Sequence, residues 1–102
     1  MRIPDRAIAE IQSRLDLAEV VGEYTVLTRR GGRFWGCCPF HQEKTPSFSV
    51  TPEKGVFYCF GCHKGGGLFQ FVMEAEKVPF RDAVELLAKK AGVELPREEE
   101  EP

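Results

Sequence analysis

The chain has no long apolar run. Its first residues, Met1 to Asp5, lead straight into a polar helical pattern and contain no apolar stretch of the kind found in signal peptides. Nowhere does the sequence reach the roughly 20 consecutive apolar residues of a membrane span. Cysteine is also scarce, with four residues in 102, and free thiols that serve a metal fit a reducing compartment. We therefore expect a cytoplasmic protein that makes no membrane contact.

Catalytic groupings are scarce as well. No serine has an evident histidine partner, and the carboxylates fall mainly on the outer faces of expected helices. The glycines 65–67 precede a helical pattern, but the Lys-Ser/Thr pair of a nucleotide-binding P-loop does not follow them. We interpret these glycines as a sharp turn, the alternative being a phosphate site formed by exposed backbone amides. The sequence predicts that this domain alone is not an enzyme.

Charge is nearly balanced over the whole chain, at −2, but it is unevenly distributed. Residues 24–70 contain six basic and two acidic residues, a net charge of +4, whereas residues 71–102 contain five basic and nine acidic residues, a net charge of −4. The basic middle also carries most of the aromatic residues. Cations interleaved with rings are typical of surfaces that bind single-stranded nucleic acid.

Two short motifs offer metal ligands, Cys38-Pro39-Phe40-His41 and Cys59-Phe60-Gly61-Cys62. The two-residue gap within each motif lets a tight turn aim both side chains at one ion, and a hairpin between the motifs returns the chain to it. Three cysteines and one histidine are the ligand set of a closed, tetrahedral structural zinc site, which leaves no open position for catalysis. The predicted ligands of one structural zinc ion are Cys38, His41, Cys59 and Cys62.

Neighbouring residues compete for these assignments. Adjacent side chains of an extended segment point to opposite faces, so only one of Cys37 and Cys38 faces the ion, and the spacing favours Cys38. The same argument makes His63 a loop residue. A redox-active pair at Cys59 and Cys62 is the alternative to zinc, but such pairs usually open a helix, and this one leads into glycines.

The remaining pattern predicts an α+β fold. Helices are expected at residues 4–15, 16–21, 68–75 and 79–91, and strands at residues 23–30, 33–37, 47–51 and 56–59. The short connections favour four antiparallel strands in a meander, packed by the N-terminal and C-terminal helices. We expect one domain over residues 1–95 and an acidic, solvated linker over residues 96–102.

Several residues of the middle segment are candidates for binding nucleic acid. Strand alternation places Arg33 and Trp35 on one face and leaves open whether Phe57 or Tyr58 faces outward. The candidate phosphate contacts are Arg29, Arg30, Arg33, Lys44, Lys54 and Lys64. The candidate base contacts are Trp35, Phe48 and one of Phe57 and Tyr58.

Three segments together resemble the N-terminal zinc-binding domain of bacterial replicative DNA primases: residues 36–41 (GCCPFH), 43–50 (EKTPSFSV) and 57–62 (FYCFGC). The likeness extends from Ile3 to Val93. It implies a zinc ribbon on an antiparallel sheet, with the zinc ligands already predicted. It also implies that the sheet contacts single-stranded template DNA, helps to recognise initiation sites and influences primer length.

The resemblance also implies partners. RNA polymerisation would belong to a separate catalytic domain of the parent primase, a nucleotidyltransferase, and residues 96–102 would begin the connection to it. The zinc-binding domain would act on a polymerase domain of its own or a neighbouring molecule, and a further domain would meet the replicative helicase. The alternative function is a protein-docking zinc module whose exposed rings meet a partner such as the polymerase domain.

Overall fold

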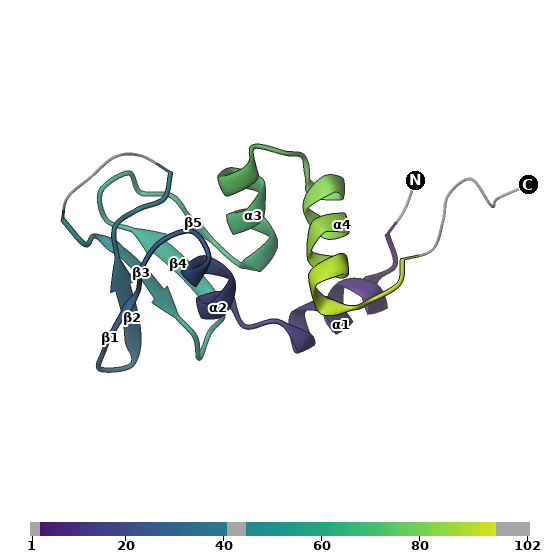
Figure 1. Ribbon diagram of the computed structural model, residues 1–102, viewed down its shortest axis with the longest axis horizontal. Helices are drawn as coiled ribbons and strands as arrows, with labels where there is room; N and C mark the ends of the chain where they lie inside the picture. The colour runs from purple at the N-terminus through teal and green to yellow at the C-terminus, as the bar shows by residue number, and fades with distance from the viewer. Residues whose placement is uncertain (1–2, 41–44, 96–102) are drawn as a thin grey trace, which may run out of the picture.

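The computed structural model describes residues 3–40 and 45–95 (Figure 1). Within these residues the chain forms four helices and one five-stranded sheet. The helices are α1 (Asp5–Arg14), α2 (Leu17–Gly22), α3 (Leu68–Glu76) and α4 (Phe80–Ala91). The strands are β1 (Thr28–Arg30), β2 (Arg33–Gly36), β3 (Phe48–Thr51), β4 (Val56–Cys59) and β5 (Gly65–Gly66). None of the described helices is both long and apolar enough to cross a lipid bilayer.

The sheet is an antiparallel meander in the order β1-β2-β3-β4-β5, which confirms the predicted α+β class. The helices lie to one side of it, where α2 and α3 cover one sheet face and α4 packs against α3 and α1 (Figure 1). We call the face covered by α2 and α3 the inner face, and the opposite face the outer face. This arrangement leaves the outer face uncovered by any described helix.

Two predictions about the strands were wrong. The first strand is confined to Thr28–Arg30, because the N–H groups of Tyr24 and Thr25 donate to the Val21 carbonyl and prolong the turn that ends α2. The predicted glycine turn instead contributes a fifth strand, in which Gly65 and Gly66 pair with β4. A β-carbon at Gly65 would lie 3.0 Å from the ring of Tyr58, so glycine permits this close pairing.

The segment after α2 is tied to α3 by Tyr24. Its ring meets the ring of Phe71 edge-on, with centroids 5.2 Å apart, and its hydroxyl donates to the carboxylate of Glu76. Burial and the hydrogen bond to Glu76 raise the pKa of Tyr24 to about 12, so the phenol remains neutral at physiological pH. This contact holds Tyr24 and the turn after α2 against α3.

Four phenylalanine rings form the core beneath the sheet. The rings of Phe48 and Phe57 stack with their centroids 5.3 Å apart. The ring centroid of Phe71 in α3 lies 6.0 Å from that of Phe48 and 5.6 Å from that of Phe57. The ring of Phe40 lies within 5.8 Å of all three. Because Phe40 follows Cys38 by two residues, the first predicted metal motif is packed directly into the core.

Phe48, a predicted base contact, and Phe57, one of two alternatives with Tyr58, are both buried in the core. Their exposed fractions are 0% and 2%, so neither ring reaches the surface. The strand register explains this burial, since Phe48 lies opposite Cys59 and Phe57 opposite Val50, all on the inner face. The alternation that the sequence left open is thereby resolved, with Tyr58 facing outward at 38% exposure.

Replacing Phe48 by alanine tests this core. The substitution removes a fully buried ring and should lower the free energy of unfolding by roughly 3–5 kcal/mol, out of a total of about 5–15 kcal/mol for a domain of this size. Urea denaturation of the zinc-loaded protein, followed by circular dichroism, measures the loss. The matched control is Tyr58→Ala on the outer face, which should cost about 1 kcal/mol or less. Equal losses for the two variants would contradict the assignment of Phe48 to the core.

Candidate metal centre

Three cysteine sulfurs converge at one end of the sheet. Cys38 follows β2, Cys59 ends β4, and Cys62 lies in the turn after β4. Their Sγ atoms all lie within 4.8 Å of one another, and those of Cys38 and Cys62 are 3.8 Å apart. In a tetrahedral site with Zn–S bonds of about 2.3 Å, two sulfurs are separated by about 3.8 Å. The spacing of the thiols therefore fits one zinc ion.

Backbone N–H groups support two of the sulfurs. In the first knuckle (residues 38–41), the N–H of Phe40 donates to Cys38 Sγ at 3.4 Å. In the second knuckle (residues 59–62), the N–H groups of Gly61 and Cys62 donate to Cys59 Sγ at 3.3 and 3.5 Å. These donors follow from the two-residue gap, because the tight turn brings the backbone back over the sulfur. They favour the thiolate form, which is the form that binds metal.

The two buried thiols differ in acidity. Burial raises the pKa of Cys38 to about 12, although the N–H of Phe40 opposes the shift. Burial also acts to raise the pKa of Cys59, but the N–H groups of Cys62 and Gly61 outweigh it and leave the pKa below its ordinary value. Without a cation, Cys38 therefore keeps its proton at neutral pH, and the charge of a bound metal would favour its ionised form.

His41, the fourth predicted ligand, lies outside the described residues, so the complete ligand set remains a prediction. Among the described residues, the cysteine cluster is the group of possible ligands with metal-binding spacing, and it includes neither Cys37 nor His63. His63 instead holds its ring Nδ1 3.0 Å from the hydroxyl of Tyr58. Cys37 is half-buried and lines a groove with Trp35. The third sulfur, Cys38, favours a structural zinc over a redox pair of Cys59 and Cys62.

The outer face carries a row of three aromatic rings. Trp35 and Tyr58 both lie opposite Ser49, one on each neighbouring strand. Phe60 stacks with Trp35, with centroids 5.9 Å apart and planes 19° from parallel, and meets the edge of Tyr58 at 4.9 Å. We call Trp35, Phe60 and Tyr58 the aromatic row. Phe60, which is 53% exposed, was not among the predicted contacts. The sequence feature that could have indicated its outward position is its place within the knuckle. Phe60 directly follows Cys59, whereas Phe40, whose ring points into the core, is two residues after Cys38.

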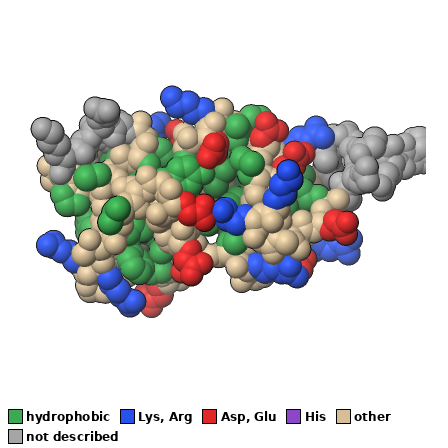
Figure 2. Space-filling model, viewed as in Figure 1, with side chains coloured by type: hydrophobic (Ala, Val, Ile, Leu, Met, Phe, Trp, Pro, Cys, Tyr) green, Lys and Arg blue, Asp and Glu red, His purple; other side chains and the backbone are tan. Residues whose placement is uncertain are grey.

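Two arginines flank the aromatic row. Arg30 and Arg33 pair across the β1–β2 hairpin on the outer face, the face of Trp35. Within the described part of the chain, neither makes an ion pair. Figure 2 shows basic side chains around the tip of this hairpin and acidic ones over the middle of the molecule. The five strands contain three arginines and no acidic residue.

The other predicted phosphate contacts are dispersed. Arg29 lies on the opposite face from Arg30, with its guanidinium 5.6 Å from the ring centroid of Phe34. Lys54 is exposed in the turn between β3 and β4, and Lys64 forms an ion pair with Glu74 at 3.2 Å. Lys44 lies outside the described residues. The structure therefore gathers Arg30 and Arg33 beside the rings and separates Arg29 from them.

Comparison with known proteins gives consistent matches. The profile of the CHC2 zinc finger family matches residues 3–102. A DNA primase of Geobacillus stearothermophilus is 53% identical over 94 residues, and one of Treponema pallidum is 52% identical over 94 residues. Both alignments cover 92% of this chain but 16% of the relative, so the chain spans about a sixth of the length of these proteins.

A solved structure also matches. The crystal structure of the Aquifex aeolicus primase, which comprises zinc-binding and RNA polymerase domains, superposes with a TM-score of 0.80 at 36% identity. The superposition covers 94% of this chain and 23% of that chain.

Substitution of single cysteines tests the metal centre. Cys59→Ser should abolish tight zinc binding and unfold the sheet, because a structural zinc contributes roughly 10–16 kcal/mol of binding energy in small peptides. That energy is comparable to the whole stability of the domain. Zinc content by mass spectrometry and folding by circular dichroism measure the effect. The control, Cys37→Ser, should retain one zinc ion per chain. Loss of zinc from the control would instead place Cys37 in the site.

Proton release gives a second test. Zinc ligation requires thiolates, so binding at pH 7 should expel at least one proton per chain, with Cys38 as a donor because its pKa lies well above 7. Affinity should therefore fall as the pH is lowered. Calorimetric titration in two buffers of different ionisation enthalpy measures the number of protons. A binding heat that is the same in both buffers would contradict the prediction.

Proposed function

Because this chain belongs to the CHC2 zinc finger family and has the fold of a primase zinc-binding domain, we propose that it is the template-binding module of a DNA primase. The outer face of the sheet binds unpaired template DNA, helps to recognise the site of initiation and influences the length of the RNA primer. The module itself catalyses no reaction. RNA polymerisation belongs to a separate domain of the parent protein, of the kind present in the Aquifex aeolicus primase.

The observation that supports this proposal is the aromatic row beside two arginines. Successive bases stack on aromatic side chains with roughly 1–3 kcal/mol per base, largely independent of sequence. The row offers three rings, of which Phe60 contacts both others, and Phe60 and Tyr58 are 53% and 38% exposed. Arg30 and Arg33 lie on the same face and are free of described carboxylates. Stacking surface and phosphate-binding charge thus occur together on a face that no described helix covers.

The number of cations limits the affinity. Neutralising three or four phosphates of a single strand gives a slope of log affinity against log salt of only about −2 to −3. We infer that the isolated module binds weakly and adds selectivity to a stronger site. The natural partner is the polymerase domain, in the same molecule or in a neighbouring one. Residues 1–95 form the module, and residues 96–102 begin the connection to that domain.

The cellular setting follows from the same proposal. A primase acts at the replication fork, which in bacteria lies in the cytoplasm. The contact with the replicative helicase belongs to another domain of the parent protein. This module therefore works as part of a primosome.

Substitution of Arg33 tests template binding. Arg33→Ala should weaken the binding of single-stranded oligonucleotides and make the salt slope shallower by about 0.7 to 1, the contribution of one phosphate contact. The matched control is Arg6→Ala, which removes an exposed arginine of α1 at the far end of the molecule. Fluorescence anisotropy titrations at several salt concentrations measure both variants.

The titration also discriminates between template binding and protein docking. Binding of the isolated polymerase domain, with no salt-dependent binding of single strands, would identify a protein-docking module and refute the proposal. An unchanged salt slope for Arg33→Ala would reject Arg33 as a phosphate contact.

A further inference from the structure

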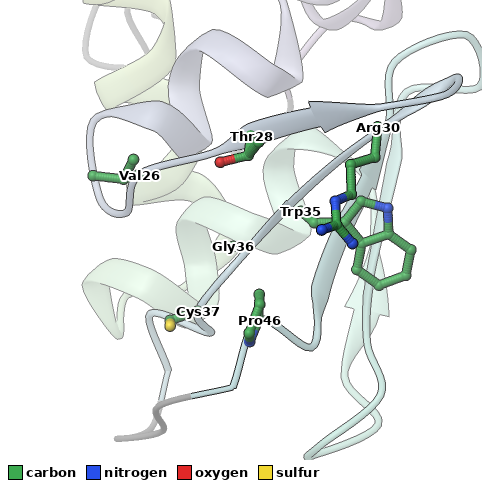
Figure 3. Close-up of a pocket in the computed structure, with 7 residues that line it drawn as sticks. All are labelled: Val26, Thr28, Arg30, Trp35, Gly36, Cys37 and Pro46. Carbon is green, nitrogen blue, oxygen red and sulfur yellow. The ribbon is translucent and has the colours of Figure 1, made fainter.

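A groove lies at the β1 end of the aromatic row. It has a volume of about 400 Å³ and lies between the segment leading into β1 and the end of β2. The residues that line this groove, which we call the Trp35 groove, are Val26, Thr28, Arg30, Trp35, Gly36, Cys37 and Pro46. Figure 3 shows Arg30 and Trp35 at one end of it and Cys37 and Pro46 at the other.

We propose that the Trp35 groove binds one unpaired base of the template and is the part of this surface that discriminates between bases. This inference rests on the proposed function, since it assumes that single-stranded DNA crosses the outer face. It assigns different tasks to two adjoining regions. The aromatic row stacks bases of any identity, whereas the groove selects one of them.

The shape and lining of the groove suit a base. Its walls are mainly apolar, and Val26 at its rim is 84% exposed. Its volume falls within the range of about 300–1,000 Å³ that small-molecule sites occupy. A planar, weakly polar group gains most from such walls, because apolar contact replaces water at the faces of its ring.

The position of Trp35 connects the groove to the row. An indole ring has two faces, and Phe60 stacks on one of them at a centroid distance of 5.9 Å. The surface that Trp35 gives to the groove is therefore its other face or its edge. A base seated in the groove lies next to the stacked pair of Phe60 and Trp35, so a single strand can pass from the row into the groove without turning away from the sheet.

Polar groups at the rim supply selectivity. Arg30 presents a guanidinium with five N–H donors and makes no ion pair in the described part of the chain. Thr28 presents a hydroxyl, which both donates and accepts. Hydrogen bonds between such groups and base edges distinguish one base from another, whereas stacking does not. The absence of acidic residues from the strands disfavours a cationic or basic peptide as the occupant.

Gly36 maintains the wall of the groove. A β-carbon at this position would lie 2.5 Å from the carbonyl oxygen of Val26, closer than side chains pack. Only glycine lets the segment that contains Val26 approach the end of β2. The groove thus results from a close backbone contact and keeps its shape without a ligand.

The test uses the fluorescence of Trp35, the only tryptophan of the chain. The probes are hexanucleotides in which one position at a time is A, C, G, T or abasic, titrated into the zinc-loaded protein. At one position we expect affinity to differ roughly five- to hundred-fold between the preferred base and the other three, the range that well-placed hydrogen bonds to a base edge give. An abasic site measures stacking alone, since loss of a base weakens binding at any stacked position. Binding of the preferred base should quench the fluorescence of Trp35.

Two matched variants locate the effect. Thr28→Phe fills the groove with a residue that strands favour, and should reduce the difference between bases to twofold or less while oligonucleotides still bind. Thr51→Phe makes the same change on the outer face at the far end of β3, and should leave discrimination as in the parent. Circular dichroism and zinc content verify that both variants are folded.

The outcomes separate the two proposals. If the parent protein binds no hexanucleotide, template binding and the groove assignment both fail. If it binds but no position discriminates, or if Thr28→Phe retains the full discrimination, the groove assignment alone is overturned. Loss of discrimination in Thr28→Phe and its retention in Thr51→Phe establish the groove as the site of selection.

Discussion

The convergence of Cys38, Cys59 and Cys62 on one point is the constraint on which both faces of the sheet depend. The second knuckle is tied to its neighbours by backbone hydrogen bonds, from Cys59 N–H to the Lys64 carbonyl and from Phe60 N–H to the Ser47 carbonyl. Each knuckle also carries a ring, with Phe40 directed into the core and Phe60 onto the outer face. A metal that closes the knuckles therefore positions the inner and the outer aromatic clusters together.

This coupling explains how so small a sheet can expose rings and arginines on its outer face. Its strands are two to four residues long, and short strands give little stability of their own. The phenylalanine core on the inner face and the metal supply that stability. The residues of the outer face therefore need to contribute little to folding. Arg30 and Arg33 can then be exposed without an acidic partner in the described part of the chain, which is consistent with the proposed contact to a polyanionic strand.

Much of this organisation was predictable from the sequence, because the ligand spacing and the short connections constrain the metal motif and the meander strongly. The face of the sheet to which each residue of Val56–Cys59 points could not be predicted. Alternation in Val56–Cys59 is compatible with either Phe57 or Tyr58 outward, and only packing against Phe71 of α3 decides it. Phe48 was misassigned for the same reason. The shortness of β1 follows from the turn after α2, in which the N–H groups of Tyr24 and Thr25 donate to the Val21 carbonyl. The side chain of Tyr24 is also held by Glu76, 52 positions away, and that contact leaves no local signal.

The central claim is that the metal maintains the sheet as well as its own two turns. Hydrogen exchange of the zinc-loaded and the chelator-treated protein, followed by mass spectrometry, tests it most directly. Removing zinc should abolish protection throughout β3 and β4, including the amides of Val50 and Phe57, which lie two residues from Phe48 and Cys59 along their strands. Loss of protection confined to the two knuckles, with β3 and β4 still protected, would contradict it.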